Sequence, residues 1–254
     1  MLFTEPMRRS PRYNISRCFQ GPQNGTYKFL SALFVTGAFL LTSPESYALF
    51  LPETGTIKSK LVEMKDSSET HIDLQGFIAP PMADKFIEIA STLPPAPHRI
   101  LFKLNSRSGG SVQEGLKIIE AIDELKLNGY QFNSTVLNGE TCGSMCVPLF
   151  LQGQKRTAGA VSVFMLHGVV PNAFTNIPNE SRTRDYLKLF IRAGVSEEWI
   201  EQKWEDGVFT TPGYFWITGQ RLVDEKSGMI SDLIPAHEVL EPVRPPFDPN
   251  IRPR

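Results

Sequence analysis

Leu104-Asn-Ser-Arg-Ser-Gly-Gly-Ser-Val-Gln-Glu-Gly115 joins an apolar strand to an amphipathic helix through a short polar loop with two adjacent glycines. The strand is predicted over 99–105 and the helix over 111–127. The helix is predicted because apolar residues recur at helical spacing and share one face. These residues are Val112, Leu116, Ile119 and Ile122. The stretch therefore indicates a βα unit with a glycine-rich turn between its two elements.

The rest of the chain repeats this alternation of strands and helices. Further strands are predicted over 71–78, 132–137 and 161–166. Further helices are predicted over 82–92, 182–193, 196–204 and 217–226, with Ser181 and Ser196 as N-caps. One more helix begins no earlier than about Ser144, because Pro148 must fall among its first residues. The repeated βα order predicts an α/β domain with largely parallel strands.

The composition is that of a globular protein. The chain has 254 residues, of which 41% are hydrophobic and 21% charged. The 26 Lys and Arg nearly balance the 27 Asp and Glu, and no basic cluster with interleaved aromatic residues occurs. Nucleic acid is therefore not an expected partner. No apolar run reaches the roughly 20 residues of a membrane span, so a polytopic membrane protein is not expected.

The amino terminus has the order of a secretory signal peptide. Basic residues precede an uncharged, mostly apolar run over 29–41, and the small residues Ser46 and Ala48 follow. We therefore expect a signal peptide over 1–48 and a periplasmic or secreted protein, with an uncleaved membrane anchor as the alternative. Residues 49–69 are expected to form an N-terminal segment. The Pro-rich residues 236–254 are expected to form a mobile tail.

Two further segments follow the glycine-rich stretch in a specific order. Gly143-Ser144-Met145 comes first, and Phe164-Met-Leu-His167 comes after it. Together with the glycine-rich stretch, this order resembles the Gly-Gly loop, nucleophile segment and base segment of the Clp protease proteolytic subunit and its crotonase-superfold relatives. The resemblance spans roughly 70–235 and implies a single domain built as a spiral of ββα units. It also implies a homo-oligomer, because this fold commonly stacks into trimers or larger rings.

The sequence departs from the protease pattern next to the serine. Thr141-Cys142-Gly143 replaces the small-residue run that precedes the protease serine, and Cys146 follows it. The resulting Cys-x-Ser-x-Cys pattern is similar to an exported branch of Clp-protease-like proteins. The resemblance therefore implies an exported member of this fold.

The chemistry of a serine hydrolase gives these residues possible roles. A serine hydroxyl needs an imidazole to take its proton, a carboxylate to fix the imidazole tautomer, and N–H donors for the oxyanion. Ser144 at a helix start is the candidate nucleophile, and His167 at a strand end is the candidate base. The N–H groups of Gly110 and Met145 are the candidate oxyanion donors. A plain N-cap for Ser144 and a structural histidine for His167 are the alternatives.

The acid is the candidate with the least support. Asp206 lies about where the resemblance places the family's acid, and Glu205 and Asp232 are possible substitutes. The alternative for Asp206 is a solvated acidic turn.

Two cysteines flank the candidate nucleophile. In a first helical turn the Cα atoms of Cys142 and Cys146 would lie about 6 Å apart, inside the disulfide range. We predict a disulfide between them that holds the turn presenting Ser144, since disulfides persist in exported proteins. The alternatives are two buried reduced cysteines or a zinc site shared with His167.

Taken together, the sequence predicts an exported serine hydrolase that cleaves peptide bonds through an acyl-enzyme, with no cofactor and no metal ion. The alternative is a catalytically silent binding or scaffold module with the same fold. An acyl-CoA enzyme of the crotonase type is disfavoured, because coenzyme A is expected in the cytosol. The late aromatic residues are predicted to cap the core, namely Trp199, Trp204, Tyr214, Phe215 and Trp216.

Overall fold

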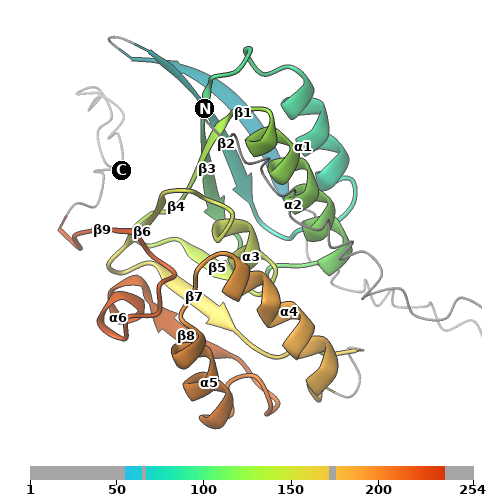
Figure 1. Ribbon diagram of the computed structural model, residues 1–254, viewed down its shortest axis with the longest axis vertical. Helices are drawn as coiled ribbons and strands as arrows, with labels where there is room; N and C mark the ends of the chain where they lie inside the picture. Colours follow the sequence, from blue (N-terminus) through green and yellow to red (C-terminus); the bar gives the residue numbers. More distant parts are fainter. Residues whose placement is uncertain (1–54, 65–66, 172–175, 238–254) are drawn as a thin grey trace, which may run out of the picture. The chain divides into compact units, whose positions relative to one another are not determined.

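The computed structural model describes residues 55–64, 67–171 and 176–237. The predicted signal peptide and nearly all of the predicted tail lie outside these residues. Within them the chain forms a six-stranded sheet, a three-stranded sheet and six helices (Figure 1). None of these helices is long and apolar enough to span a membrane.

The larger sheet has the strand order β1-β2-β3-β4-β6-β9. Its strands are Thr56–Glu63, Ser68–Gln75, Arg99–Asn105, Gln131–Val136, Arg156–Gly159 and Asp232–Ile234, in that order. Only the β1–β2 pair is antiparallel, and each of the other neighbouring pairs is parallel. The predicted α/β class with largely parallel strands is therefore confirmed for this sheet.

The smaller sheet carries the segments that lead into Ser144 and His167. Its order is β5-β7-β8, with the bounds Thr141–Gly143, Val163–Leu166 and Phe215–Thr218. Strand β5 runs parallel to β7, and β8 runs antiparallel to it. Ser106, which follows β3, donates its N–H to Thr141 (2.7 Å) and accepts the N–H of Gly143 (2.8 Å). The loop after β3 therefore lies beside the strand that leads into Ser144.

The helices are α1 Met82–Ser91, α2 Val112–Leu127, α3 Cys146–Phe150, α4 Glu180–Arg192, α5 Glu197–Glu205 and α6 Gly219–Asp224. In Figure 1, α1 and α2 lie side by side against the larger sheet. Phe86 of α1 packs on Phe102 of β3 with ring centroids 5.7 Å apart, and Phe102 packs on Phe132 of β4 at 5.6 Å. All three rings are fully buried, so helix and sheet share one apolar core.

Strand β1 has no counterpart among the predicted elements. It falls within the residues expected to be an N-terminal segment, yet it pairs with β2 along its whole length. Only Ile57 of this strand is buried, and Leu61 is exposed. An edge strand with one buried side chain has no clear period of two, so its sequence pattern does not indicate a strand.

The helix predicted over 217–226 is partly wrong. Ile217 lies in β8, where it is buried while its neighbour Trp216 is exposed, as in a strand with one covered face. Helix α6 begins only at Gly219, after Thr218 caps it by accepting the N–H of Arg221 at 3.2 Å.

One of the two predicted N-caps is confirmed. Ser196 caps α5, and its hydroxyl accepts the N–H of Trp199 at 3.2 Å. Ser181 lies inside α4, because Asn179 caps that helix by accepting the N–H of Arg182 at 2.9 Å.

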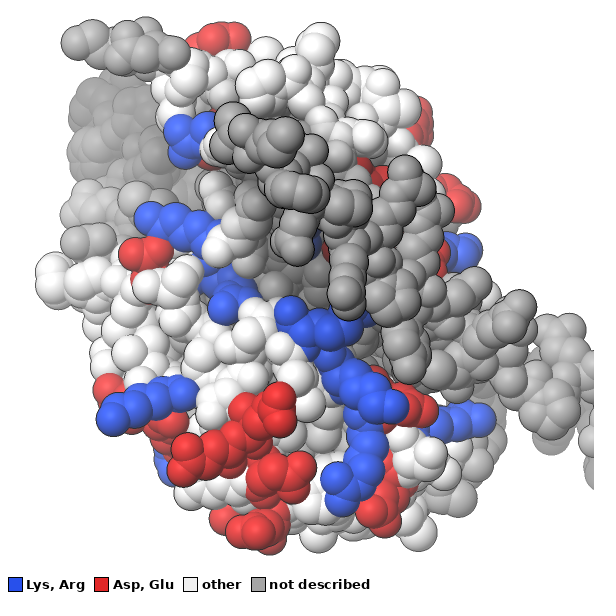
Figure 2. Space-filling view, viewed as in Figure 1, with Lys and Arg blue, Asp and Glu red and all other residues white. Residues whose placement is uncertain are grey.

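Charges of both signs share the face formed by α4 and α5. Figure 2 shows basic and acidic side chains next to one another in the lower half of the molecule. Arg184 of α4 lies 4.0 Å from Glu201 of α5, and its guanidinium stacks over Trp204 at 4.0 Å from the ring centroid. The two helices are therefore joined by a charged and a cation–π contact.

Candidate active site

Ser144 occupies a sharp turn between β5 and α3. Its φ of 50° is in the left-handed region, which costs a residue with a side chain on the order of 1–3 kcal/mol. The backbone is fixed on both sides of the turn. The Ser144 N–H donates to the carbonyl of Met165 (2.8 Å), and the Ser144 carbonyl accepts the hydroxyl of Tyr186 (3.1 Å). Such strained turns from strand to helix are typical of positions that expose a nucleophilic serine.

Helix α3 starts two residues later than the earliest start that the sequence allows. Met145 is its N-cap, Cys146 is its first residue, and Pro148 falls in its first turn as expected. Ser144 therefore precedes the helix, and the left-handed turn places it there.

The predicted disulfide is confirmed. Cys142 of β5 and Cys146 of α3 are bonded, with Cα atoms 5.2 Å apart, and both residues are fully buried. The bond links the strand before Ser144 to the helix after it. The two ends of the turn that carries Ser144 are therefore held together covalently.

His167 follows β7 and contacts Ser144 directly. Its Nε2 lies 2.8 Å from Ser144 Oγ, and its Nδ1 lies 2.7 Å from the carbonyl oxygen of Gly168. A carbonyl oxygen only accepts hydrogen bonds, so in the neutral ring the proton is on Nδ1. The lone pair of Nε2 then faces the Ser144 hydroxyl. This is the arrangement that a general base for a serine requires.

The surroundings of His167 favour its neutral form. Burial lowers the pKa of His167 below its ordinary value of 6.5, and the hydrogen bond to the Gly168 carbonyl opposes this shift only in part. Burial has this effect because it disfavours the charged imidazolium. The imidazole is therefore unprotonated at neutral pH.

The glycine-rich loop contacts the turn that carries Ser144. Gly109 has a φ of 64°, and a Cβ at this position would lie 2.6 Å from the nitrogen of Met145 and 2.7 Å from Ser144 Cβ. Only glycine fits such an approach. The close packing brings the loop that carries Gly110 next to the N–H of Met145, the other candidate oxyanion donor.

Backbone hydrogen bonds with Ile78 determine the direction of the Gly110 N–H. Ile78 donates its N–H to Gly109 (2.8 Å) and accepts the N–H of Ser111 (2.7 Å). In a parallel bridge the residue between these two turns its own N–H to the other side, so the N–H of Gly110 points away from Ile78. Within the described parts of the chain, no hydrogen bond engages the N–H of Gly110 or of Met145. Both remain available to an acceptor.

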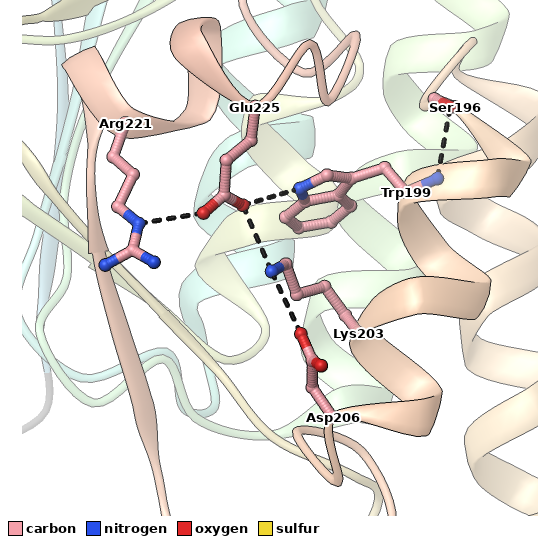
Figure 3. A network of polar contacts seen from close by, with 6 residues as sticks. All are labelled: Ser196, Trp199, Lys203, Asp206, Arg221 and Glu225. Atoms are coloured by element: carbon pink, nitrogen blue, oxygen red, sulfur yellow. Dashed lines mark hydrogen bonds and ion pairs between the residues drawn. The ribbon is translucent and has the colours of Figure 1, made fainter.

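The structure does not bring Asp206 to His167. Asp206 is the C-cap of α5, and its carboxylate pairs with Lys203 at 3.2 Å (Figure 3). Lys203 is buried and also pairs with Glu225 at 3.2 Å. The position that a triad carboxylate would take, at Nδ1 of His167, is filled by the Gly168 carbonyl. Of the predicted catalytic side chains, Ser144 and His167 therefore meet, and Asp206 belongs to another network.

That network is built around Glu225. Burial acts to raise the pKa of Glu225, but hydrogen bonds from Trp199, Arg221 and Lys203 outweigh it and hold the pKa below its ordinary value. Figure 3 shows these donors converging on the Glu225 carboxylate from α5 and α6. Glu225 therefore stays ionised and fixes the Lys203 ammonium that Asp206 contacts. Of the two substitutes for Asp206, Asp232 pairs with Lys155 at 3.2 Å.

Two tyrosines lie at the site although neither was predicted to be there. Tyr186 of α4 is buried, and its hydroxyl holds the Ser144 carbonyl. Tyr214 packs edge-on against His167, with ring centroids 5.4 Å apart and ring planes at 89°. The prediction that the late aromatic residues cap the core is right for Trp199, which is buried, and wrong for Tyr214 and Trp216, which are exposed. An aromatic residue next to β8 gives no local signal that it faces a histidine that follows another strand.

A pocket of about 290 Å³ opens beside the imidazole. It is lined by His167, Gly168, Val170, Asn176, Pro178, Gly213 and Tyr214. All of these side chains except the histidine and Tyr214 lack a titratable group. Across the described residues, no group of three His, Cys, Asp or Glu side chains is placed to hold a metal ion.

Among comparisons with known proteins, the comparison with solved structures gives matches. No family model matches the chain, and no curated protein matches it. Among solved structures, the chain is similar to a point mutant of ClpP1 from Listeria monocytogenes, with 20% sequence identity and a TM-score of 0.48. The match covers 65% of this chain and 91% of that one. The basis for a function is therefore the site of this chain itself.

Proposed function

We propose that this protein is a serine hydrolase of Clp-protease-like type that cleaves peptide bonds through an acyl-enzyme. The observation that carries the proposal is the 2.8 Å contact between Ser144 Oγ and His167 Nε2, with Nδ1 held by the Gly168 carbonyl. A bare N-cap role for Ser144 does not account for a neutral imidazole aimed at its hydroxyl. A structural histidine does not require a serine in a left-handed turn.

In the proposed reaction, Ser144 Oγ attacks the carbonyl carbon of the peptide bond while His167 Nε2 takes the hydroxyl proton. The N–H groups of Gly110 and Met145 receive the oxyanion that forms. His167 then gives its proton to the leaving amine, and the C–N bond breaks. Water, deprotonated by the same nitrogen, cleaves the ester and frees the Ser144 hydroxyl.

The proposed catalytic unit is a dyad, completed by a backbone carbonyl. The Gly168 oxygen fixes the tautomer of His167, as a carboxylate does in a triad. It carries only a partial negative charge, so it stabilises the imidazolium less. The catalytic role predicted for Asp206 would require its carboxylate to leave Lys203 and approach Nδ1.

This missing carboxylate is also the observation that favours the second candidate function, a catalytically silent binding or scaffold module. The two candidates differ in one chemical property, the nucleophilicity of Ser144.

Labelling with a fluorophosphonate probe tests the proposal. We expect covalent labelling at Ser144, because the probe traps a serine whose proton is accepted by a neighbouring imidazole. Ser144→Ala should abolish the label and His167→Ala should slow it strongly. Ser91→Ala is a matched control, since Ser91 is exposed on α1 and its hydroxyl donates to the Glu88 carbonyl of the same helix. Folded protein that takes up no label would support the silent module.

The pH dependence of hydrolysis supplies a second test. His167 must be unprotonated to act as base, and burial places its pKa below 6.5. Activity should therefore persist as the pH falls through 6.5 and decline only at lower pH, where the imidazole takes up a proton. The measurement is kcat/KM of a peptide substrate between about pH 4 and 8. An acidic limb centred at or above 6.5 would contradict the proposed environment of the base.

We also propose that the protein is exported and forms a homo-oligomer. The basic, apolar and small-residue order over 1–48 and the Cys142–Cys146 bond both support an oxidising compartment. Amino-terminal sequencing of exported protein tests cleavage near Leu49, and light scattering of the mature protein tests assembly.

A further inference from the structure

The imidazole of His167 is held in its plane by two hydrogen bonds, and a third contact comes from the start of β8. Strand β8 runs antiparallel to β7, and Leu166 pairs with Phe215 in the register. Continued one residue beyond the paired strands, this register would place His167 opposite Tyr214. Their rings meet edge-on at 89° with centroids 5.4 Å apart, a favourable aromatic geometry. The contact therefore follows from strand pairing and is built into the small sheet.

The contact depends on the ring of Tyr214 and not on its hydroxyl. Within the described residues, no hydrogen bond involves the Tyr214 hydroxyl, and the residue is 60% exposed. A large aromatic residue that is mostly exposed gains little from burial in the core. Tyr214 packs against His167 and forms part of the wall of the adjacent pocket.

The start of β8 is anchored by the ion network of α5 and α6. Phe215 lies next to Tyr214, and the Lys203 ammonium lies 5.7 Å from the Phe215 ring centroid. Lys203 is itself fixed by Glu225 and Asp206. The backbone that carries Tyr214 is therefore tied to this network, which gives the ring a defined place beside His167.

We propose that Tyr214 is a positioning residue, whose ring clamps the His167 imidazole in the orientation that joins Ser144 to the Gly168 carbonyl and keeps water off the ring. The inference rests on the proposed function, because His167 is the base of that function. A dyad has greater need of such a clamp than a triad, since no carboxylate holds its histidine.

The effect of Tyr214 on the pKa of His167 can be measured, because no charged side chain shifts that pKa. Two phenols come from the elements near the imidazole, Tyr214 beside β8 and Tyr186 from α4. Charged residues of α4 and of the glycine-rich loop also belong to these elements, namely Glu180, Arg182, Arg184, Asp185, Lys188, Arg192 and Arg107. The uncharged residues Gly168, Val170, Asn176 and Pro178 contribute to the pocket wall. Burial and the Gly168 carbonyl are the causes that act on the pKa of His167, and no charged side chain is among them. Removing the ring therefore changes mainly the burial.

The test combines NMR titration of His167 with steady-state kinetics. In Tyr214→Ala, water reaches the imidazole, so the pKa of His167 should rise toward 6.5 and the acidic limb of kcat/KM should move up with it. We expect kcat to fall by about tenfold to 100-fold, because a displaced base is misaligned with the hydroxyl. Tyr214→Phe keeps the ring and should match the wild type in all three quantities.

Trp216→Ala is the matched control. Trp216 is also exposed, lies two residues further along the chain in β8, and contacts Arg107 through a cation–π pair at 5.9 Å. Its removal should leave the pKa of His167 unchanged. An unchanged pKa in Tyr214→Ala, or a rise in KM alone, would overturn the clamp and make Tyr214 a substrate contact only. Loss of the wild-type behaviour in Tyr214→Phe would also overturn it, by assigning the effect to the hydroxyl.

A third variant separates water exclusion from charge. Tyr214→Asp places a carboxylate across the strands from the imidazole and should raise the pKa of His167 above its value in Tyr214→Ala. Equal pKa values in the two variants would show that position 214 does not face the ring. The NMR readouts need no turnover, so a pKa that responds as expected in a protein without hydrolase activity would refute the proposed function and leave the clamp standing.

Discussion

Ser144→Ala and His167→Ala should each lower kcat on a peptide substrate by on the order of 10⁴-fold or more, and the double variant should be little worse than either single one. In the proposed mechanism Ser144 and His167 share one proton transfer across 2.8 Å, so losing either partner removes the whole step. The measurement is kcat for the three variants with one substrate, together with circular dichroism to confirm folding.

Asp206→Asn is the informative companion to these variants. If the catalytic unit is the dyad of Ser144 and His167, this change should leave kcat within about tenfold of the wild type, since the Asp206 carboxylate faces Lys203. A loss comparable to that of Ser144→Ala would restore Asp206 as the third catalytic residue. Additive losses in the Ser144 and His167 double variant would show that the two side chains do not act together.

Removing the disulfide should cost both stability and reactivity. Replacing Cys142 and Cys146 together by Ala opens the loop around Ser144. A cross-link between residues four apart in sequence is worth about 2 kcal/mol of unfolding free energy in the chain-entropy model. The larger effect should be on the turn, because the left-handed Ser144 backbone then loses its covalent support. We expect fluorophosphonate labelling of Ser144 to slow by about tenfold or more.

A reducing agent supplies the control for this prediction. Reduction should slow labelling of the wild-type protein to the rate of the double variant and should leave the double variant unaffected. Chemical denaturation of both oxidised and reduced protein measures the free energy of unfolding. Equal labelling rates with and without the bond would mean that the hydrogen bonds of Ser144 to Met165 and Tyr186 suffice to hold the turn.

The elements that can be predicted from the sequence are those whose burial follows a local period. Strand β3 forms over the residues predicted for it, because its apolar residues alternate as Ile100, Phe102 and Leu104 and all three are buried. Helix α2 follows for the same reason, with buried residues at helical spacing. The glycine-rich loop can also be anticipated, since the close approach at Gly109 leaves no room for a side chain.

The rest of the site depends on contacts between distant segments. The order of the motifs predicts that Ser144 and His167 meet, but it does not predict the partner of Nδ1, because a backbone carbonyl carries no signal in the sequence. Tyr214 reaches His167 only through the register of β7 and β8, and the sequence pattern indicates a helix over part of β8. The resemblance places Asp206 at the site, whereas the Lys203 ammonium holds its carboxylate elsewhere.

The left-handed backbone at Ser144 lowers the stability of the folded state, while the serine supplies a hydroxyl at this position. Glycine adopts a φ of 50° without steric cost, so Ser144→Gly would remove strain on the order of 1–3 kcal/mol from the folded state. The greater conformational freedom of glycine in the unfolded chain would offset part of this gain. Glycine, however, has no hydroxyl. A protein that served only as a scaffold would have no use for an oxygen at this position, and the turn would tolerate the smaller residue. In the proposed hydrolase, by contrast, the hydroxyl is the reason for a side chain at this left-handed position.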